Sequence, residues 1–338
     1  KLWENIRIKA EEGRRTGIGT TAEGDMLAAL GLRYGSDNAI DFSVEVHKTV
    51  ALEAYRSSVH VAKDSGAFKL YDTKREKDNP FIKRLRAEDE EFYNEMIKFG
   101  RRNIALLTIA PTGTTSLMTQ TTSGIEPVFL PVYKRRRKVN PNDTGTNVVF
   151  TDEVGDAWEE YNVFHHKFVT WLEANGYNAD EVKGMDDEKL QQILEKSPYF
   201  KATSNDVDWL SKVRMQGEVQ KWVDHSISVT INLPKDVDEE LVGKLYVKAW
   251  ESGCKGVTVY RDGSRAGVLL GKEKQEEKKD EPAAEVSFKR PKVLEAEILR
   301  FNNDDEKWIA FVGLKDGKPY EIFTGLADEE MFPIPKSI

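Results

Sequence analysis

The segment Ile104-Ala105-Leu106-Leu107-Thr108-Ile109-Ala110-Pro111-Thr112-Gly113-Thr114-Thr115-Ser116 joins a short apolar run to a loop rich in hydroxyl groups. The run contains branched side chains and stops at Pro111, so it predicts a buried strand rather than a helix. Gly113 permits a tight loop after that strand. Backbone N–H groups of such a loop, together with threonine and serine hydroxyls, can converge on an anion. An ordinary helix N-cap explains the same pattern equally well.

The regions on either side of this segment carry further predicted elements. The loop itself lacks the lysine of a nucleotide-hydrolysing P-loop, so a phosphate bound there would belong to a substrate. Residues 227–233 alternate between apolar and polar types, which predicts a strand, and a helix over 238–252 and a strand over 257–260 complete a βαβ unit. Apolar spacing predicts helices over 41–67 and 88–99. The fold class is therefore α/β.

The chain divides into five expected parts. They are a segment with the anion loop (1–150), a helical insertion with a stripe formed by Trp158, Phe164, Phe168, Trp171 and Leu172 (151–225), the final strands and helix (226–271), a charged linker (272–290) and a small β-rich C-terminal domain (291–338). The linker is almost entirely charged and cannot bury enough apolar area to offset the entropy of ordering. In the last part, Asp316-Gly317 between apolar runs predicts a hairpin.

The composition excludes several classes of protein. The 338 residues carry a net charge of -8 and a single cysteine, Cys254. One cysteine excludes an intramolecular disulfide framework and favours a reducing compartment, so we expect the cytoplasm. No run approaches the ~18 apolar residues of a membrane span, so no membrane partner is expected. The acidic balance argues against nucleic acid as a partner.

The basic run at 134–138 is interpreted as a solvated strand or loop edge, with contact between one or two of its arginines and substrate phosphates as a further option.

Four other features have structural interpretations. Gly17-Ile18-Gly19-Thr20-Thr21-Ala22 has the spacing of a dinucleotide fingerprint, but the charged residues before it cannot form the buried strand of such a site, so it predicts a glycine-rich turn entering a helix. Glu126, before Pro127, is interpreted as a solvated loop carboxylate. The five histidines have no ligand-spaced partners, so no metal site is expected. Cys254 is interpreted as an inert buried thiol, with activation by the neighbouring Lys255 as the alternative.

Four motifs, in their order along the chain, resemble the large catalytic chain of ribonucleotide reductases, and the adenosylcobalamin-dependent class II enzymes are the most similar class. The motifs are Arg14-Arg15-Thr16-Gly17-Ile18-Gly19, Ile109-Ala110-Pro111-Thr112-Gly113-Thr114-Thr115-Ser116, Ser123-Gly124-Ile125-Glu126-Pro127 and Gly253-Cys254-Lys255-Gly256-Val257-Thr258-Val259-Tyr260-Arg261-Asp262-Gly263-Ser264-Arg265. The resemblance covers residues 1 to about 271, and the tail at 290–324 is similar to the small C-terminal domain of some class II chains. It implies the later strands and helices of a ten-stranded α/β barrel, which is incomplete in this chain.

The resemblance also implies roles for individual residues. The phosphates of a ribonucleoside di- or triphosphate would bind to Ala110, Pro111, Thr112, Gly113, Thr114, Thr115 and Ser116. The cofactor adenosylcobalamin would lie close to Val257, Thr258, Val259 and Tyr260. Class I relatives carry two tyrosines for radical transfer where this chain has Thr258 and Val259, so radical generation from cobalamin fits better.

The chain departs from the family in its cysteines. The family's thiyl-radical cysteine and redox cysteine pair lie on the earlier part of the barrel, so the N-terminal portion of the reductase is an expected partner and no catalytic residue is expected here. A thioredoxin-type reductant is a further expected partner, and a homodimer is one option. We therefore expect the C-terminal part of an enzyme that makes 2'-deoxyribonucleotides by cobalamin-initiated thiyl radical chemistry. The alternatives are a non-catalytic nucleotide-phosphate-binding subunit or remnant and, less favoured by the acidic charge, a nucleic-acid-binding module.

Overall fold

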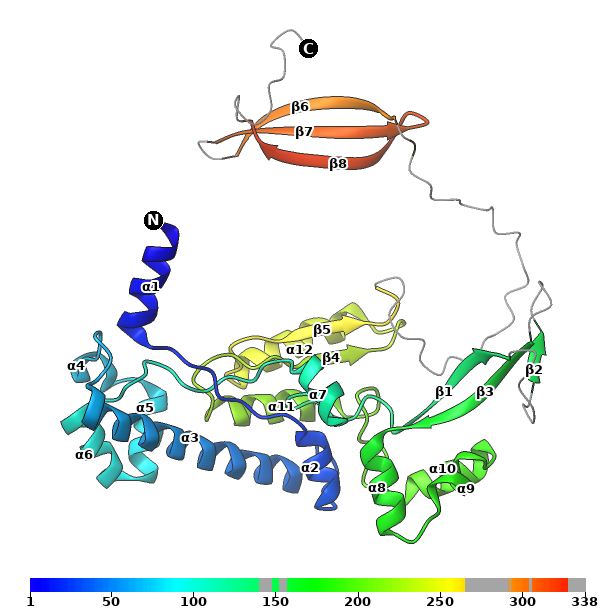
Figure 1. Ribbon diagram of the computed structural model, residues 1–338, viewed down its shortest axis with the longest axis horizontal. Coiled ribbons are helices and arrows are strands. Elements are labelled where there is room, and N and C mark those ends of the chain that lie inside the picture. The colour runs from blue at the N-terminus through cyan, green and yellow to red at the C-terminus, as the bar shows by residue number, and fades with distance from the viewer. Residues whose placement is uncertain (140–147, 152–156, 265–290, 292, 304–305, 328–338) are drawn as a thin grey trace. The chain divides into compact units, whose positions relative to one another are not determined.

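A computed structural model describes residues 1–139, 148–151, 157–264, 291, 293–303 and 306–327 (Figure 1). The chain forms two compact units, Lys1–Lys272 and Glu273–Ile338. The charged linker predicted at 272–290 lies outside the described residues.

Four extended segments of the first unit lie parallel to one another and form a ladder. The segment 104–110, predicted as a buried strand, is extended and partly buried, but isolated bridges take the place of a regular strand, and it is hydrogen-bonded on both sides. On one side it pairs in parallel with residues 16–18, through the bridge between Ile18 and Leu107. On the other side Ile109 pairs in parallel with Ile227. The chain continues from Ile227 into β4 (Thr230–Leu233), which pairs in parallel with β5 (Thr258–Arg261).

A buried carboxylate interrupts the regular pairing of the segment at 104–110. Asp224 accepts hydrogen bonds from the backbone N–H groups of Leu106 and Leu107, both at 2.8 Å, and from the hydroxyl of Tyr55 at 2.6 Å. These N–H groups bond to a side chain instead of a neighbouring strand, so the segment is extended without a continuous ladder. Asp224 thereby fixes this segment to the long helix α3, which carries Tyr55.

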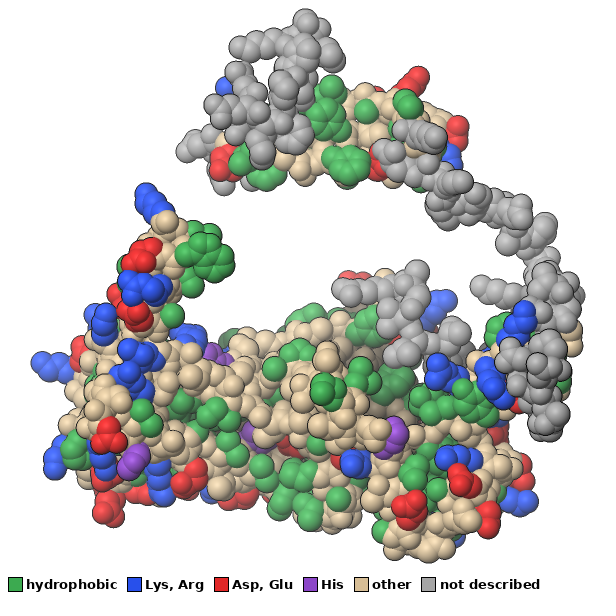
Figure 2. Space-filling model, in the orientation of Figure 1, with side chains coloured by type: hydrophobic (Ala, Val, Ile, Leu, Met, Phe, Trp, Pro, Cys, Tyr) green, Lys and Arg blue, Asp and Glu red, His purple; other side chains and the backbone are tan. Residues whose placement is uncertain are grey.

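Helices of the first half flank this ladder. They are α1 (Leu2–Gly13), α2 (Glu23–Ala29), α3 (Asp37–Ser65), α4 (Thr73–Glu76), α5 (Pro80–Glu88) and α6 (Glu90–Phe99), followed after the ladder segment by α7 (Gly113–Thr119). The predicted long helix is confirmed as α3, with Ser36 as its N-cap. Its buried residues pack with α5, α6 and the apolar side chains of 106–109 in one core. In contrast, hydrophobic side chains project from α1, where Trp3 is 81% exposed (Figure 2).

The predicted βαβ unit is confirmed. Helix α12 (Glu239–Glu251) connects β4 to β5 and packs beside α11 (Trp209–Gln220). Ile231 and Leu233 of β4 join Leu245 of α12 and Val213 of α11 in a second core. Alternate residues of β4 point to this core, because side chains of a strand alternate between its faces.

The prediction of a mostly helical region from 151 onward is wrong at its start. There β1 (Val132–Lys138), β2 (Val148–Thr151) and β3 (Ala157–Phe164) form an antiparallel sheet in the order β1-β3-β2. Trp158 and Phe164 therefore lie on a strand and not on a helical stripe. The aromatic spacing is compatible with a helix, but pairing of residues 157–164 with two other strands overrides it. The helices expected after it are present as α8 (His166–Ala174), α9 (Ala179–Lys183), α10 (Asp187–Glu195) and α11.

The second unit is an antiparallel sheet of β6 (Glu295–Asn303), β7 (Glu306–Lys315) and β8 (Lys318–Leu326). Its strands confirm those predicted in the tail. The hairpin predicted at Asp316-Gly317 joins β7 to β8, and both turn residues have positive φ angles, 53° and 72°. This is the conformation that Asp-Gly favours in a two-residue hairpin turn.

Candidate functional site

The predicted anion loop lies at the carboxyl end of the ladder segment 104–110. Thr112 is the N-cap of α7, with a left-handed backbone (φ 50°), and Gly113 begins the helix. The first helical N–H groups of α7 have no acceptor within the helix, as at any helix start. Ala110, Pro111, Gly113, Thr114 and Thr115 are all exposed. The loop thus presents donors to solvent, as the anion-binding interpretation requires. Thr112 makes no side-chain capping hydrogen bond to α7, so the ordinary N-cap interpretation is not supported.

The hydroxyl groups of the loop divide into two sets. The Thr112 hydroxyl accepts from the N–H of Gly124 at 2.7 Å and lies 3.0 Å from the hydroxyl of Thr21. The buried Ser116 hydroxyl donates to the carbonyl of Gly113 at 2.9 Å and lies 2.6 Å from that of Ser123. These two shape the loop. Within the described residues, the exposed Thr114 and Thr115 hydroxyls make no hydrogen bond.

The turn at 17–22 supports the loop from beside it. As predicted, this glycine-rich turn enters a helix, since α2 begins directly after Ala22. Gly19 packs so closely on the backbone of Thr108 that a Cβ atom there would overlap the Thr108 carbonyl oxygen. The N–H of Ala22 donates to the carbonyl of Thr122 at 3.0 Å. The carboxyl ends of two neighbouring parallel segments therefore meet at this loop, where ligands of open α/β sheets commonly bind.

The two faces of the β4–β5 pair differ in character. Val257 and Val259 pack against the core formed with α11 and α12. Thr258 and Tyr260 alternate with them, and they lie opposite Thr230 and Asn232 of β4. The face turned away from α12 is thus lined by hydroxyl and amide groups. Of the four residues expected near the cofactor, only Thr258 and Tyr260 belong to this polar face.

Glu126 is not the solvated carboxylate that its sequence context predicted. It forms an ion pair of 2.6 Å with Lys212, whose side chain is 1% exposed, and it accepts from the N–H of Thr230 at 2.6 Å. Lys212 also donates to the carbonyl of Thr230 at 2.6 Å. The pair satisfies both backbone groups of Thr230 and joins the chain after α7 to the first residue of β4. Lys212 lies 86 residues from Glu126, so no local pattern revealed this contact.

A second buried carboxylate, Glu23 of α2, lies close to a histidine, His47 of α3. Glu23 is 2% exposed, and neither carboxylate oxygen forms a hydrogen bond with a described residue. The imidazole Nε2 of His47 lies 3.5 Å from Oε2 of Glu23 and 3.3 Å from the Thr20 hydroxyl. Burial raises the pKa of Glu23 above 4.5, and the nearby His47 opposes that rise. Sequence analysis did not identify either residue.

Cys254 matches the inert interpretation. Its half-buried thiol packs with the core of α11 and α12 and lies 3.9 Å from the carbonyl oxygen of Val213. Burial raises the pKa of this thiol to about 11, which contradicts the alternative of an activated thiolate.

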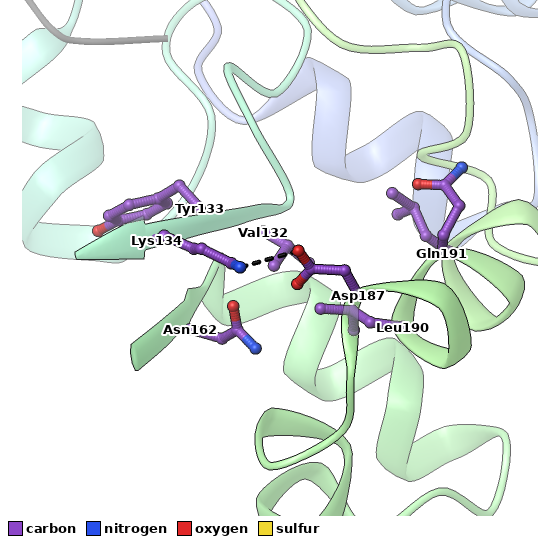
Figure 3. A pocket seen from close by; sticks show the side chains of 8 residues that line it. Val132, Tyr133, Lys134, Asn162, Asp187, Leu190 and Gln191 are labelled. Atoms are coloured by element: carbon purple, nitrogen blue, oxygen red, sulfur yellow. Dashed lines mark hydrogen bonds and ion pairs between the residues drawn. The ribbon is translucent and has the colours of Figure 1, made fainter. Parts of the chain in front are cut away.

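The basic run at 134–138 lies on the strand β1, as interpreted. Arg136 pairs with Glu160 at 2.6 Å and Arg137 pairs with Glu159, both across the sheet on β3. Lys134 reaches Asp187 of α10 at 2.8 Å (Figure 3). The cavity beside this pair has a volume of only about 20 Å³, little more than a water molecule needs. These contacts balance much of the positive charge and leave little support for a phosphate or nucleic-acid site here.

The described residues contain neither a candidate metal site nor a candidate membrane span. No three histidine, cysteine, aspartate or glutamate side chains gather closely enough there to hold a metal ion. None of the helices in the described part of the chain has the length and apolar character needed to cross a membrane.

Comparison with known families agrees with this geometry. Residues 2–260 match the family described as "Ribonucleotide reductase, barrel domain". This chain belongs to that family. Residues 294–338 match a second family, described as "NrdJ homologue C-terminal domain". The unclosed parallel ladder is therefore part of a ribonucleotide reductase barrel, as the resemblance implied.

Curated relatives of this reductase barrel chain carry names that refer to vitamin B12. The "Vitamin B12-dependent ribonucleoside-diphosphate reductase" of Mycobacterium tuberculosis is 28% identical over 77% of this chain and 33% of its own length. The enzyme of the same name from Thermoplasma acidophilum is 27% identical over 82% of this chain and 32% of its own length. The "Vitamin B12-dependent ribonucleotide reductase" of Rhodopirellula baltica is 25% identical over 96% and 34%. The chain thus spans about a third of the length of these relatives.

Among solved structures, the alpha subunit of the Actinobacillus ureae class Id ribonucleotide reductase has a similar fold. It superposes with a TM-score of 0.51 at 19% identity, over 75% of this chain and 40% of that subunit. This similarity supports the barrel fold.

Proposed function

We propose that this chain forms the C-terminal part of a vitamin B12-dependent ribonucleotide reductase and binds the phosphates of the ribonucleotide substrate through the loop at 110–116. The observation that carries the proposal is the exposed pair of hydroxyls of Thr114 and Thr115, beside the free N–H groups at the start of α7. They lie at the carboxyl end of a parallel ladder, in a chain that matches the reductase barrel over residues 2–260. Neutral donors of this kind stabilise phosphate oxygens without a lysine.

The loop residues would have two different roles, donation to phosphate oxygens and positioning of the loop. Thr114, Thr115 and the N–H groups of the first turn would donate to phosphate oxygens. Thr112 and Ser116 would act as positioning residues, because their hydroxyls are already bonded within the loop. The turn at 17–22 would hold Thr112 in place through Thr21.

Adenosylcobalamin is the cofactor that the proposed enzyme requires. The polar face of β4–β5 fits a ligand rich in amide and hydroxyl groups, because Thr230, Asn232, Thr258 and Tyr260 all belong to it. Thr258 and Tyr260 would be the contacts from β5, and Val257 and Val259 would support them from the core side. When bound, this cofactor supplies the radical that initiates the reaction.

This chain's own contribution would be binding and orientation. Cys254 packs with the helices on the opposite face from Thr258 and its thiol pKa is raised, so it is a poor candidate for the radical cysteine. The essential cysteines would come from the N-terminal portion of the enzyme. A thioredoxin-type reductant, a homodimer and a cytoplasmic location remain predictions from the sequence.

The test is adenosylcobalamin-dependent reduction of a ribonucleoside diphosphate. The chain alone is compared with the chain mixed with the polypeptide that precedes it in the reductase. Activity in the mixture only is the expected result. Activity of the chain alone would show that the essential thiols are wrongly assigned, and absence of activity from both would favour a non-catalytic subunit.

A matched pair of variants tests the loop itself. Thr114→Val removes one exposed hydroxyl from the loop, and Thr49→Val removes one from the surface of α3. A lost hydrogen bond to a charged phosphate costs about 1.5–3 kcal/mol, so Thr114→Val should raise the KM or Kd for the diphosphate roughly tenfold or more. Thr49→Val should change neither. Equal behaviour of the two variants would remove the loop from the substrate site.

A further inference from the structure

A cavity of about 590 Å³ lies between α2, α8 and the chain that follows α10. None of the loop residues 110–116 lines it, so it is separate from the proposed phosphate loop. Its volume falls in the range of small-molecule sites in proteins.

Two helix faces and the segments that follow α2 and α10 form the walls. Lys167, Trp171 and Ala174 line it from α8, and their spacing of four and three residues places them on one side of that helix. Asp25 and Ala28 line it from α2 at the same kind of spacing. The other walls are formed by residues 195–199 and by Gly31 and Arg33 in the segment after α2.

The carboxylate of Asp25, which lines the cavity, forms hydrogen bonds to the segments of the other walls. Its carboxylate accepts from the imidazole Nε2 of His165, which precedes α8, at 2.8 Å and from the Tyr199 hydroxyl at 2.9 Å. It also accepts from the N–H of Thr122 at 2.7 Å. Contacts from three separate segments hold the walls in fixed positions, so the cavity is preformed. These hydrogen bonds also occupy the carboxylate oxygens of Asp25, so Asp25 is less available to pair with a cation in the cavity.

The carboxylates that line the cavity have hydrogen-bond partners, whereas its cationic side chains have none within the part of the chain that the structure describes. Arg33, Lys167 and Lys196 line it, and none of them forms an ion pair or side-chain hydrogen bond with any residue in the described ranges. Lys167 is half-buried, which adds to the cost of leaving its charge unpaired. Besides Asp25, the lining contains one other carboxylate, Glu195, which accepts from Gln191 at 3.3 Å. Three unpaired cations around one concave surface favour an anionic ligand.

Apolar side chains, including that of Trp171, also line the cavity. The indole of Trp171 stacks with Phe168, at 5.8 Å and 8°, and with Tyr177, at 6.1 Å and 24°. These contacts hold the ring, which lines the cavity together with Ala28 and Pro198. A rigid aromatic side chain beside small apolar groups suits the ring of a ligand.

We propose that this cavity binds a small organic anion that carries both phosphate groups and an aromatic ring. Arg33, Lys167 and Lys196 contact the phosphates, and the ring lies beside Trp171. The site is distinct from the phosphate loop and does not depend on the function proposed for that loop.

The test uses the 338-residue chain labelled with 5-fluorotryptophan and observed by fluorine NMR. Trp171→Phe assigns the Trp171 signal among those of the 7 tryptophans. ADP is the probe, and inorganic pyrophosphate and adenosine are the single-part controls. ADP should shift the Trp171 signal in a saturable manner and bind more tightly than either control. Isothermal titration calorimetry of the unlabelled Thr114→Val variant gives the dissociation constants of this cavity with the contribution of the phosphate loop reduced.

Two charge variants test the role of the cations. Each cation lost from a phosphate contact should weaken ADP binding roughly tenfold, so Lys167→Gln with Lys196→Gln should weaken it about a hundredfold. Lys183→Gln with Lys189→Gln removes the same charge outside the cavity, from surface ion pairs, and should leave binding unchanged.

Thr114→Val separates this site from the phosphate loop. The Trp171 response should persist in this variant, even if binding at the loop is lost. The proposal is overturned if ADP leaves the Trp171 signal unchanged, if the Lys167 and Lys196 variant binds ADP as the control variant does, or if adenosine binds as tightly as ADP.

Discussion

Replacing Glu126 with alanine should destabilise the first unit strongly, because it isolates a buried charge. Lys212 is 1% exposed and would keep only the carbonyl of Thr230, at 2.6 Å, as a partner. The N–H of Thr230 would lose its carboxylate acceptor as well. The variant therefore removes the ion pair, leaves the Lys212 cation without a counter-charge and leaves the N–H of Thr230 without its carboxylate acceptor.

The magnitude follows from these two losses. Breaking a buried ion pair on one side costs about 3–5 kcal/mol, and Glu126 is itself 22% exposed, so water can reach the site and the lower end, about 3 kcal/mol, is expected. Glu126→Gln keeps an oxygen for Thr230 and should cost less, about 1–2 kcal/mol. In a Lys212→Met background no cation is left unpaired, so Glu126→Ala should then cost about 1 kcal/mol.

The assay is urea unfolding of the four proteins of this double-mutant cycle, followed by circular dichroism. Hydrogen exchange at the Thr230 amide provides a local measurement at the start of β4. A coupling energy of about 2 kcal/mol and faster exchange in Glu126→Ala are expected. The same cost of Glu126→Ala in both backgrounds would refute the idea that the buried charge dominates.

Three other predictions concern single sites. Gly19→Ala should cost at least about 4 kcal/mol or prevent folding, because the new methyl overlaps the Thr108 carbonyl, whereas Gly243→Ala, which meets open space on α12, should be neutral or stabilising in thermal unfolding. Glu23→Gln should stabilise the protein near pH 7. Burial raises the folded-state pKa of Glu23 above 4.5, so the wild type loses stability as the pH rises above that value. In unfolding experiments across pH, the stability gained by the variant over the wild type should therefore vanish below pH 4.5. A gain that grows toward low pH would contradict this cause. Cys254, with a pKa of about 11 against an ordinary 9.0, should hold about a hundredfold less thiolate at neutral pH, so iodoacetamide should alkylate it far more slowly in the folded than in the unfolded chain.

Local patterns in the sequence predicted much of this fold correctly. The apolar periodicity of 41–67 predicted α3, the alternation at 227–233 predicted β4, and Asp316-Gly317 predicted the hairpin between β7 and β8. The loop at 110–116 was also found from local features, because a proline, a glycine and a series of hydroxyls follow one apolar run. The role of that loop in substrate binding stays a prediction.

Contacts between distant residues account for what the sequence did not reveal. Residues 157–164 form a strand because β1 and β2 pair with them, and their aromatic spacing alone was misleading. Val257 and Val259 face the helices while Thr258 and Tyr260 face away, a division that depends on which side of β5 the helix α12 covers. The pairing of Glu126 with Lys212 and the anchoring of Leu106 and Leu107 by Asp224 likewise join residues far apart in the chain.

The amino-acid sequence by itself determined the helices, the main parallel strands, the glycine turns and the family, because these depend on periodicity, on backbone freedom and on motifs that neighbouring residues carry. Only the tertiary structure decided which loop hydroxyls stay exposed, which carboxylates are buried and paired, and where the cavity beside Trp171 lies. The reason is physical: burial and ion pairing depend on which segments pack together, and the segments that bury Lys212 or bond to Asp25 are separated from them by many residues.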